Sequence, residues 1–109
     1  MVALIKPELA EITSREVSRY SGTMPGALMY PILDDQHQRY GVVIIPEDEK
    51  DRPAYMAVLA RVIEDFIVID EDGSYDKPLY QALMVNGGVP REQIILAYKG
   101  ETLPDQVTG

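Results

Sequence analysis

The first regular pattern of apolar positions is helical and lies near the N-terminus. Between Pro7 and Tyr20 the apolar residues recur at a spacing that gathers them near one helix face, namely Leu9, Ile12, Val17 and Tyr20. Pro7 suits the first helical position, and Gly22 can end the helix. The pattern therefore predicts a helix over residues 7–20.

Four later stretches have the β-branched and aromatic composition of strands. They cover residues 27–34, 39–46, 54–62 and 66–72. Short turns or a charged connector separate them, so we expect an antiparallel meander. Pro31 removes a ladder donor, which predicts that the first of these strands lies at a sheet edge. The preceding stretch "GTMPG", residues 22–26, is expected to be an irregular connection.

A second helix is predicted to begin at Pro78 and is followed by a glycine-rich joint. Its shared face is formed by Leu79, Ala82, Leu83 and Asn86. Gly87 or Gly88 can adopt the left-handed conformation that ends a helix. Pro90 then opens a single turn over residues 90–93, and "IILAY", residues 94–98, is expected to be a buried strand that rejoins the sheet.

The order of elements predicts one α+β domain over residues 1–109. It comprises an N-terminal helix, an antiparallel meander of about four strands, a second short helix and a final strand. The tail from about residue 100 lacks a hydrophobic pattern and is expected to be loose. No apolar run approaches the roughly 20 residues that cross a bilayer. The start lacks signal-peptide character, so the protein is expected to be cytoplasmic, without membrane contact.

Composition and charge exclude several functions. The chain of 109 residues has no cysteine and a single histidine, His37, which excludes disulfides and thiolate or histidine-rich metal sites. Its formal net charge is −8, whereas proteins that bind phosphate backbones cluster lysine and arginine. We therefore expect contact with nucleic acid only indirectly, through a basic partner.

The stretch "NGGVPREQIIL", residues 86–96, superficially suggests a phosphate-binding loop. Such loops place glycine N–H groups ahead of a helix, at the positive end of its dipole. Here the glycines follow a helix, whose carbonyl end would repel a phosphate. Gly87, Gly88 and Pro90 are therefore expected to form a structural cap and turn.

Other candidates for chemistry have better structural explanations. "DEDGS", residues 70–74, fails as a calcium loop, because the first and twelfth positions would be Val68 and Leu79. The acidic clusters Asp34/Asp35, Glu47/Asp48/Glu49 and Glu64/Asp65 fall in turns where charge is normally solvated, as does His37. The serines have no nucleophile-elbow context. We predict no catalytic residue, cofactor or metal site, and a magnesium-dependent enzyme using the acidic turns is a remote alternative.

The seven tyrosines suggest an interface. Tyr40, Tyr55 and Tyr98 lie on or beside predicted strands, where tyrosine suits both half-buried sheet faces and contacts between proteins. Core packing is the alternative. The methionines at 29, 56 and 84 add adaptable apolar surface. These three tyrosines are our candidate partner-interface residues, and a homo-oligomer, most simply a dimer, is expected.

Three blocks of sequence resemble the XisI family, the fdxN element excision controlling factors found mainly in cyanobacteria. They are "ILDDQHQRY" (32–40), "YMAVLARVIEDFIVIDED" (55–72) and "ALMVNGGVPREQIILAY" (82–98), of which the last is the most specific. Two family tryptophans are replaced here, one in the Gly-Trp pair where Ile45 and Pro46 stand and one at Val68. The tail also lacks the family's basic and aromatic residues.

The resemblance implies a non-catalytic accessory factor in programmed DNA excision during heterocyst development. It also implies a companion, the nuclease-like XisH-type protein, as partner. An acidic chain fits such a role as a cap on a basic DNA-handling protein. An antitoxin-like or immunity-like neutraliser of a neighbouring nuclease is the alternative within the same class of binding proteins.

Overall fold

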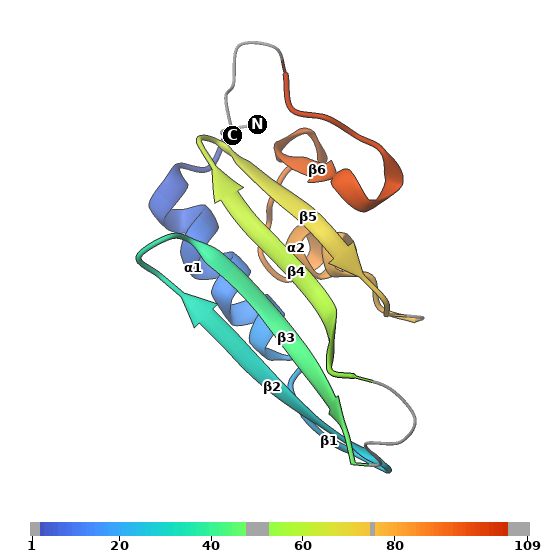
Figure 1. Ribbon diagram of the computed structural model, residues 1–109. Helices are drawn as coiled ribbons and strands as arrows, with labels where there is room; N and C mark the ends of the chain where they lie inside the picture. Colours follow the sequence, from blue (N-terminus) through green and yellow to red (C-terminus); the bar gives the residue numbers. More distant parts are fainter. Residues whose placement is uncertain (1–2, 48–52, 75, 105–109) are drawn as a thin grey trace.

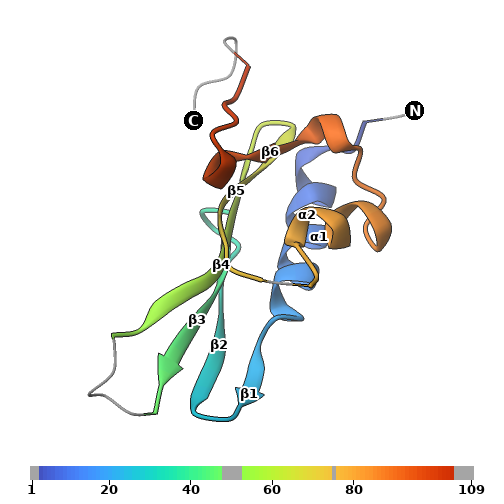
Figure 2. The ribbon, with the colours of Figure 1, turned by 90° about the vertical axis from the view of Figure 1, so that its right-hand side faces the viewer.

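The computed structural model of the protein describes residues 3–47, 53–74 and 76–104, which form one mixed sheet with both α-helices on the same face (Figures 1 and 2). The elements in chain order are α1 (Lys6–Ser18), β1 (Gly22–Met24), β2 (Ala27–Asp34), β3 (Arg39–Pro46), β4 (Tyr55–Ile63), β5 (Phe66–Asp72), α2 (Leu79–Val85), the 3-10 turn η1 (Arg91–Gln93), β6 (Ile94–Leu96) and the 3-10 turn η2 (Ala97–Lys99). The strands lie in the sheet in sequence order, and every neighbouring pair is antiparallel except β5 and β6. The predicted α+β class is confirmed.

The strand β1 corrects the expectation of an irregular connection after α1. Its three residues pair with the start of β2, in a register that sets Met24 beside Ala27 and Gly22 beside Met29. A three-residue strand is too short to show a period, so periodicity could not predict it. Because β1 covers only this start, the outer edge of β2 from Tyr30 to Asp34 has no neighbouring strand in the described part of the chain. Pro31 therefore lies at an edge, as predicted.

The main core lies between the sheet and the two helices. Leu9 and Val17 of α1 are fully buried there, as the helical pattern predicted. The same helix face also buries two polar residues, Thr13 and Glu16, which the apolar pattern did not identify. The Thr13 hydroxyl donates to the Leu9 carbonyl at 2.6 Å, so its burial leaves no unpaired hydroxyl.

The joint after α2 needs two glycines for two different reasons. Gly88 has φ +69°, and it ends the helix with bonds from the Gly88 N–H to the Met84 carbonyl and from the Val89 N–H to the Leu83 carbonyl. Gly87 instead permits close packing, since a Cβ there would lie 2.4 Å from Ile12 Cγ2 of α1. The cap predicted at Gly87 or Gly88 is therefore formed by Gly88.

The final segment is bound into the fold by one buried amide. Gln93 accepts from the Leu4 N–H at 2.9 Å and donates to the carbonyls of Leu4 and Asp65. It joins the start of the chain, the β4–β5 turn and the start of β6. The predicted strand 94–98 ends early, at Leu96, where the chain turns into η2. Its pairing with β5 is parallel.

The first residues of the tail are packed, although the whole tail was expected to be loose. The Glu101 N–H donates to the Leu96 carbonyl, and its carboxylate accepts from the Leu96 N–H at 2.8 Å. Arg91 pairs with the same carboxylate at 2.8 Å. These bonds place Leu103 against a second, smaller cluster of Ile63, Val68 and Ile95. Residues 105–109 lie outside the described ranges.

The contact at Gly87 leads to the first prediction. Gly87→Ala should lower the free energy of unfolding by about 1–3 kcal/mol, because the new methyl group overlaps Ile12 Cγ2 at 2.4 Å and the Leu83 carbonyl oxygen at 2.7 Å. The loss should be smaller in an Ile12→Ala background, where the obstructing methyl group is absent. Urea unfolding of the four chains measures this coupling. Gly73→Ala is the control, since its nearest atom lies at 3.6 Å. An equal loss in both backgrounds would contradict the proposed cause.

Candidate partner-binding site

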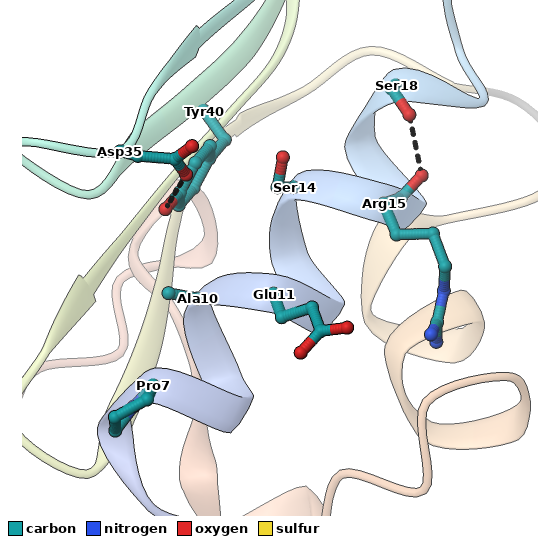
Figure 3. Close-up of a pocket in the computed structure, with 8 residues that line it drawn as sticks. All are labelled: Pro7, Ala10, Glu11, Ser14, Arg15, Ser18, Asp35 and Tyr40. Carbon is teal, nitrogen blue, oxygen red and sulfur yellow. Dashed lines mark hydrogen bonds between the residues drawn. The ribbon is translucent and has the colours of Figure 1, made fainter.

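A polar hollow lies between α1 and the β2–β3 hairpin (Figure 3). It is open to solvent and has a volume of about 570 Å³. The helix lines it with Pro7, Ala10, Glu11, Ser14, Arg15 and Ser18. Asp35 and Tyr40 point toward the helix from the hairpin, whereas the Arg15 side chain extends away from them (Figure 3). The hollow lacks apolar anchors and is a weak candidate for binding.

Tyr40 is a core residue, which corrects its selection as a partner-interface candidate. Its side chain is fully buried, and its hydroxyl donates to Asp35 Oδ1 at 3.0 Å. Burial, together with the neighbouring Asp35 carboxylate, raises the pKa of Tyr40 to about 12. Tyrosine is common both in cores and at interfaces, so composition alone could not separate the two roles.

A second hollow is mostly apolar, and Tyr55 lies in it. We call it the Met–Tyr hollow. It has a volume of about 470 Å³ and is lined mainly by Tyr20, Met24, Met29, Ile44, Tyr55 and Glu71. Met24 and Tyr55 have exposed fractions of 46% and 43%. Flexible methionines and partly exposed tyrosines adapt to the shape of a bound protein segment. This hollow is the better candidate for a partner site.

The Met–Tyr hollow is assembled from residues that lie far apart in the sequence. Register pairs Ile44 of β3 with Tyr55 of β4, so both side chains lie on the helix side of the sheet. Tyr20 follows α1 and closes one wall, while Met24 comes from β1. Met24 was not a predicted interface residue, because the stretch "GTMPG" has turn composition. The only sequence signal for Met24 was that an apolar side chain stands in a short connection between elements, and this signal alone is too weak to predict a binding residue.

The polar network beside this hollow fixes its wall. The Tyr20 hydroxyl donates to the Lys77 carbonyl, and burial, with a contribution from the Asp72 charge, raises the pKa of Tyr20 to about 12. Asp72 accepts from the Leu79 N–H at 2.7 Å and from the Ser74 N–H at 3.0 Å. The "DEDGS" stretch is therefore the end of β5 followed by a turn, and Asp72 within it holds the start of α2.

The third candidate, Tyr98, lies in η2 on the helix side of the sheet and is half-buried against the main core. Burial raises its pKa, with a further contribution from the charge of Asp72. Lys99 lies over its ring at 5.8 Å. The structure therefore does not bring the three predicted tyrosines together. Tyr55 lies in the Met–Tyr hollow, Tyr98 lies beside the core, and Tyr40 lies inside it.

A buried carboxylate links the two helices. Glu16 accepts from Asn86 Nδ2 at 2.9 Å and pairs with Arg15 at 3.0 Å and Arg19 at 3.3 Å. Burial alone would raise its pKa, but the hydrogen bonds from Asn86 and Arg15 and the two positive charges lower it overall. Glu16 is therefore held as a carboxylate, and it fixes the end of α2 against α1.

Two further acidic side chains make local bonds, Asp34 in the β2–β3 hairpin and Asp70 in β5. Asp34 accepts from the His37 N–H and from His37 Nδ1, and the backbone bond is the main cause of its lowered pKa. Asp70 pairs with Arg61 at 2.9 Å. No three metal-ligating side chains gather in residues 3–47, 53–74 and 76–104. In the cluster Glu47/Asp48/Glu49, only Glu47 is within the described ranges. No helix there is long and apolar enough to cross a membrane.

The protein is a small α+β domain with both helices on one face of its sheet and an apolar hollow at its surface. Such a hollow is suited to binding another protein segment. The family model described as XisI protein matches residues 4–108, and the chain belongs to the XisI family. The resemblance inferred from the three sequence blocks is thus confirmed. A comparison with curated proteins gave no match.

Two solved structures share the fold. One is the fdxN element excision controlling factor XisI from Anabaena variabilis ATCC 29413, with a TM-score of 0.68 and 21% identity over 84% of this chain and 85% of that chain. The other is a XisI-like protein from the same organism, with a TM-score of 0.63 and 19% identity over 94% of this chain and 88% of that chain.

The buried Glu16 leads to the second prediction. Because its folded-state pKa is below 4.5, its stabilising effect is present above that pH and is lost as pH falls through the folded-state pKa. Glu16→Gln should therefore lower stability at pH 7 by about 1.5–3 kcal/mol, with the difference shrinking below pH 4.5. Urea unfolding from pH 7 to pH 3 measures it. Glu11→Gln on the same helix is the charge-matched control, and an identical profile for both variants would contradict the assignment.

Proposed function

We propose that this protein is a non-catalytic controlling factor that acts by binding a protein partner. Family membership over residues 4–108 is the observation that carries the proposal. A structural relative is described as an fdxN element excision controlling factor, and the role is extended from it to this chain. The proposed partner is an XisH-type, nuclease-like protein.

The Met–Tyr hollow is the proposed contact for that partner. Met24 and Tyr55 offer apolar anchors, and Glu71 adds a negative charge to the lining. An amphipathic segment with apolar and basic side chains would match this combination. Hot spots of binding are commonly aromatic and centrally placed, which favours Tyr55 as the residue with the largest effect.

Charge also supports a protein partner over nucleic acid. The chain has a net charge of −8, and repulsion from phosphates would oppose direct binding to DNA. The same charge would attract a basic DNA-handling protein and accelerate their association at low salt. The proposed action on DNA is therefore indirect.

The third prediction tests this contact. An XisH-type protein encoded beside this chain should co-purify with it, and raising the salt concentration should weaken the complex. Tyr55→Ala and Met24→Ala should each weaken binding about 10-fold to 30-fold in calorimetry, as expected for anchors worth about 1.4–2 kcal/mol. Val85→Ala is the control, because Val85 is 81% exposed on α2 and does not line the hollow.

Two outcomes would contradict the proposal. Tight binding of the isolated protein to duplex DNA at physiological salt would overturn the indirect mode of action. Unchanged affinity in both hollow variants would remove the Met–Tyr hollow as the contact. If the partner is toxic when expressed alone and inactive in the complex, this protein is a neutraliser of that partner, and it binds through the same contact.

A further inference from the structure

The sheet face opposite the helices carries an apolar patch. Ladder register and the alternation of side chains place its members on this face of β2, β3 and β4. They are Leu28, Tyr30, Ile32, Val43, Ile45, Met56 and Leu59, and we call them the open-face patch. Ile32, Tyr30 and Ile45 have exposed fractions of 52%, 49% and 40%. Figure 2 shows that both helices lie on the other side of the sheet.

The protein covers only part of this face with its own chain. Over β4, β5 and β6, the cluster of Ile63, Val68 and Ile95 packs against Phe66, Ala97 and Leu103. On the same part of the face, the ion pair between Arg61 of β4 and Asp70 of β5 supplies polar groups. The open-face patch over β2, β3 and β4 receives no such cover from the described residues. The open face is thus divided into a covered part and an uncovered part.

The charges along β3 indicate what can cover the patch. Side chains alternate along a strand, so Arg39, Val43 and Ile45 share the open face, and Glu47 follows in the same phase just beyond β3. The row along β3 is basic at one end, apolar in the middle and acidic at the other end, and Asp34 of β2 is the cross-strand neighbour of Arg39 at the basic end. A second copy that runs antiparallel would set Arg39 of each copy toward Glu47 of the other.

No acidic residue lies within the patch, although the chain carries a net charge of −8, and the acidic residues that the register places at its border are Asp34, opposite Arg39, and Glu71, opposite Leu59. Two copies of such a chain repel each other over most of their surfaces. They meet with the least repulsion where acidic side chains are absent. Charge therefore favours the open-face patch over other surfaces for contact between copies.

Association through the sheet edges is disfavoured at both sides. Glu47 donates its N–H to the Gly26 carbonyl at 2.9 Å. Because hydrogen bonds to β3 are made by every second residue of β2, the backbone of Pro31 faces away from β3, toward the outer edge of the sheet. Proline has no N–H, so this position offers no hydrogen-bond donor to another strand. At the other edge, Glu101 occupies the N–H and carbonyl of Leu96, and Arg91 donates to the Ile94 carbonyl. Blocked edges leave the apolar face as the available surface.

We propose that a second copy of this chain packs on the open-face patch, sheet against sheet. The two-fold axis lies between the sheets and runs across the strands, so that β3 stacks antiparallel on β3 of the partner. An axis along the strands would instead set Arg39 against Arg39. Aligned packing of this kind brings two sheets to about 10 Å and interdigitates their side chains.

The size of the patch sets the strength of this dimer. Three strands spaced at about 4.8 Å and eight residues rising about 3.3 Å each give a footprint of about 14 Å by 26 Å, or roughly 370 Å². Patches of this scale are often functional. A standard interface takes about 800 Å² from each partner, so a contact of this smaller size belongs to the weak, transient class. Met56 belongs to both the open-face patch and the lining of the Met–Tyr hollow, whereas Met29, Ile44 and Tyr55 line the hollow from the helix side of the sheet.

Sedimentation equilibrium from 1 to 500 µM provides the test and the fourth prediction. The wild type should pass from monomer to dimer within this range. Ile32→Lys should raise the dimer dissociation constant at least tenfold. Val85→Lys places the same change on exposed α2 and should leave it unchanged. Thermal melts of every variant verify folding. A monomeric wild type at 500 µM, or an unaffected dimer of Ile32→Lys, would overturn the proposal.

Charge reversal tests the orientation of the two copies. Arg39→Glu and Glu47→Arg should each weaken self-association, because each sets like charges together at both ends of the row. An equimolar mixture of the two variants should dimerise as well as the wild type, since opposite charges then face each other at both ends. The same recovery is expected for the double variant. Failure of both to recover would overturn the antiparallel arrangement.

Discussion

The close contact between α1 and the end of α2 is the constraint on which the rest of the structure depends. Gly87 lacks the side chain that would collide with Ile12, and Asn86 binds the buried carboxylate of Glu16. Both helices are thereby held on one face of the sheet (Figure 2). Hydrophobic burial is concentrated there, and the opposite face must be satisfied by other means.

The two parts of the opposite face are satisfied in different ways. Arg91 and Glu101 hold the chain after β6, so that Leu103 reaches the small cluster on β5 and β6. The part over β2, β3 and β4 keeps exposed isoleucines and a tyrosine. This part is the surface proposed for self-association, and it meets the proposed partner site at Met56, which also lines the Met–Tyr hollow.

Periodicity and turn composition predicted the main elements well. The stretches 27–34, 39–46 and 66–72 coincide with β2, β3 and β5, and residues 54–62 differ from β4 by one residue at each end. These strands are long enough for their composition to act as a signal. The elements that were missed or shortened, β1 and β6, have three residues each, and long-range pairing decides their formation.

The candidate site was less predictable because tertiary packing assembles it. Tyr55 is partly exposed, whereas Tyr40 has the same composition signal and lies in the core. Met24 reaches the Met–Tyr hollow only because β1 pairs with β2. The burial of Glu16 depends on Asn86, which is 70 residues away in the sequence. Neither relation can be inferred from spacing along the chain.

The bond network of Gln93 has a consequence for how this protein is made. Its amide joins Leu4 across 89 positions, so the segment that leads into α1 cannot reach its final anchor until Gln93 has left the ribosome. Chains cut short before β6 would also lack the parallel neighbour of β5. Interrupted synthesis would therefore yield products with an unanchored first helix, which proteases recognise readily. Synthesis through Gln93 is thus required before the first helix is anchored.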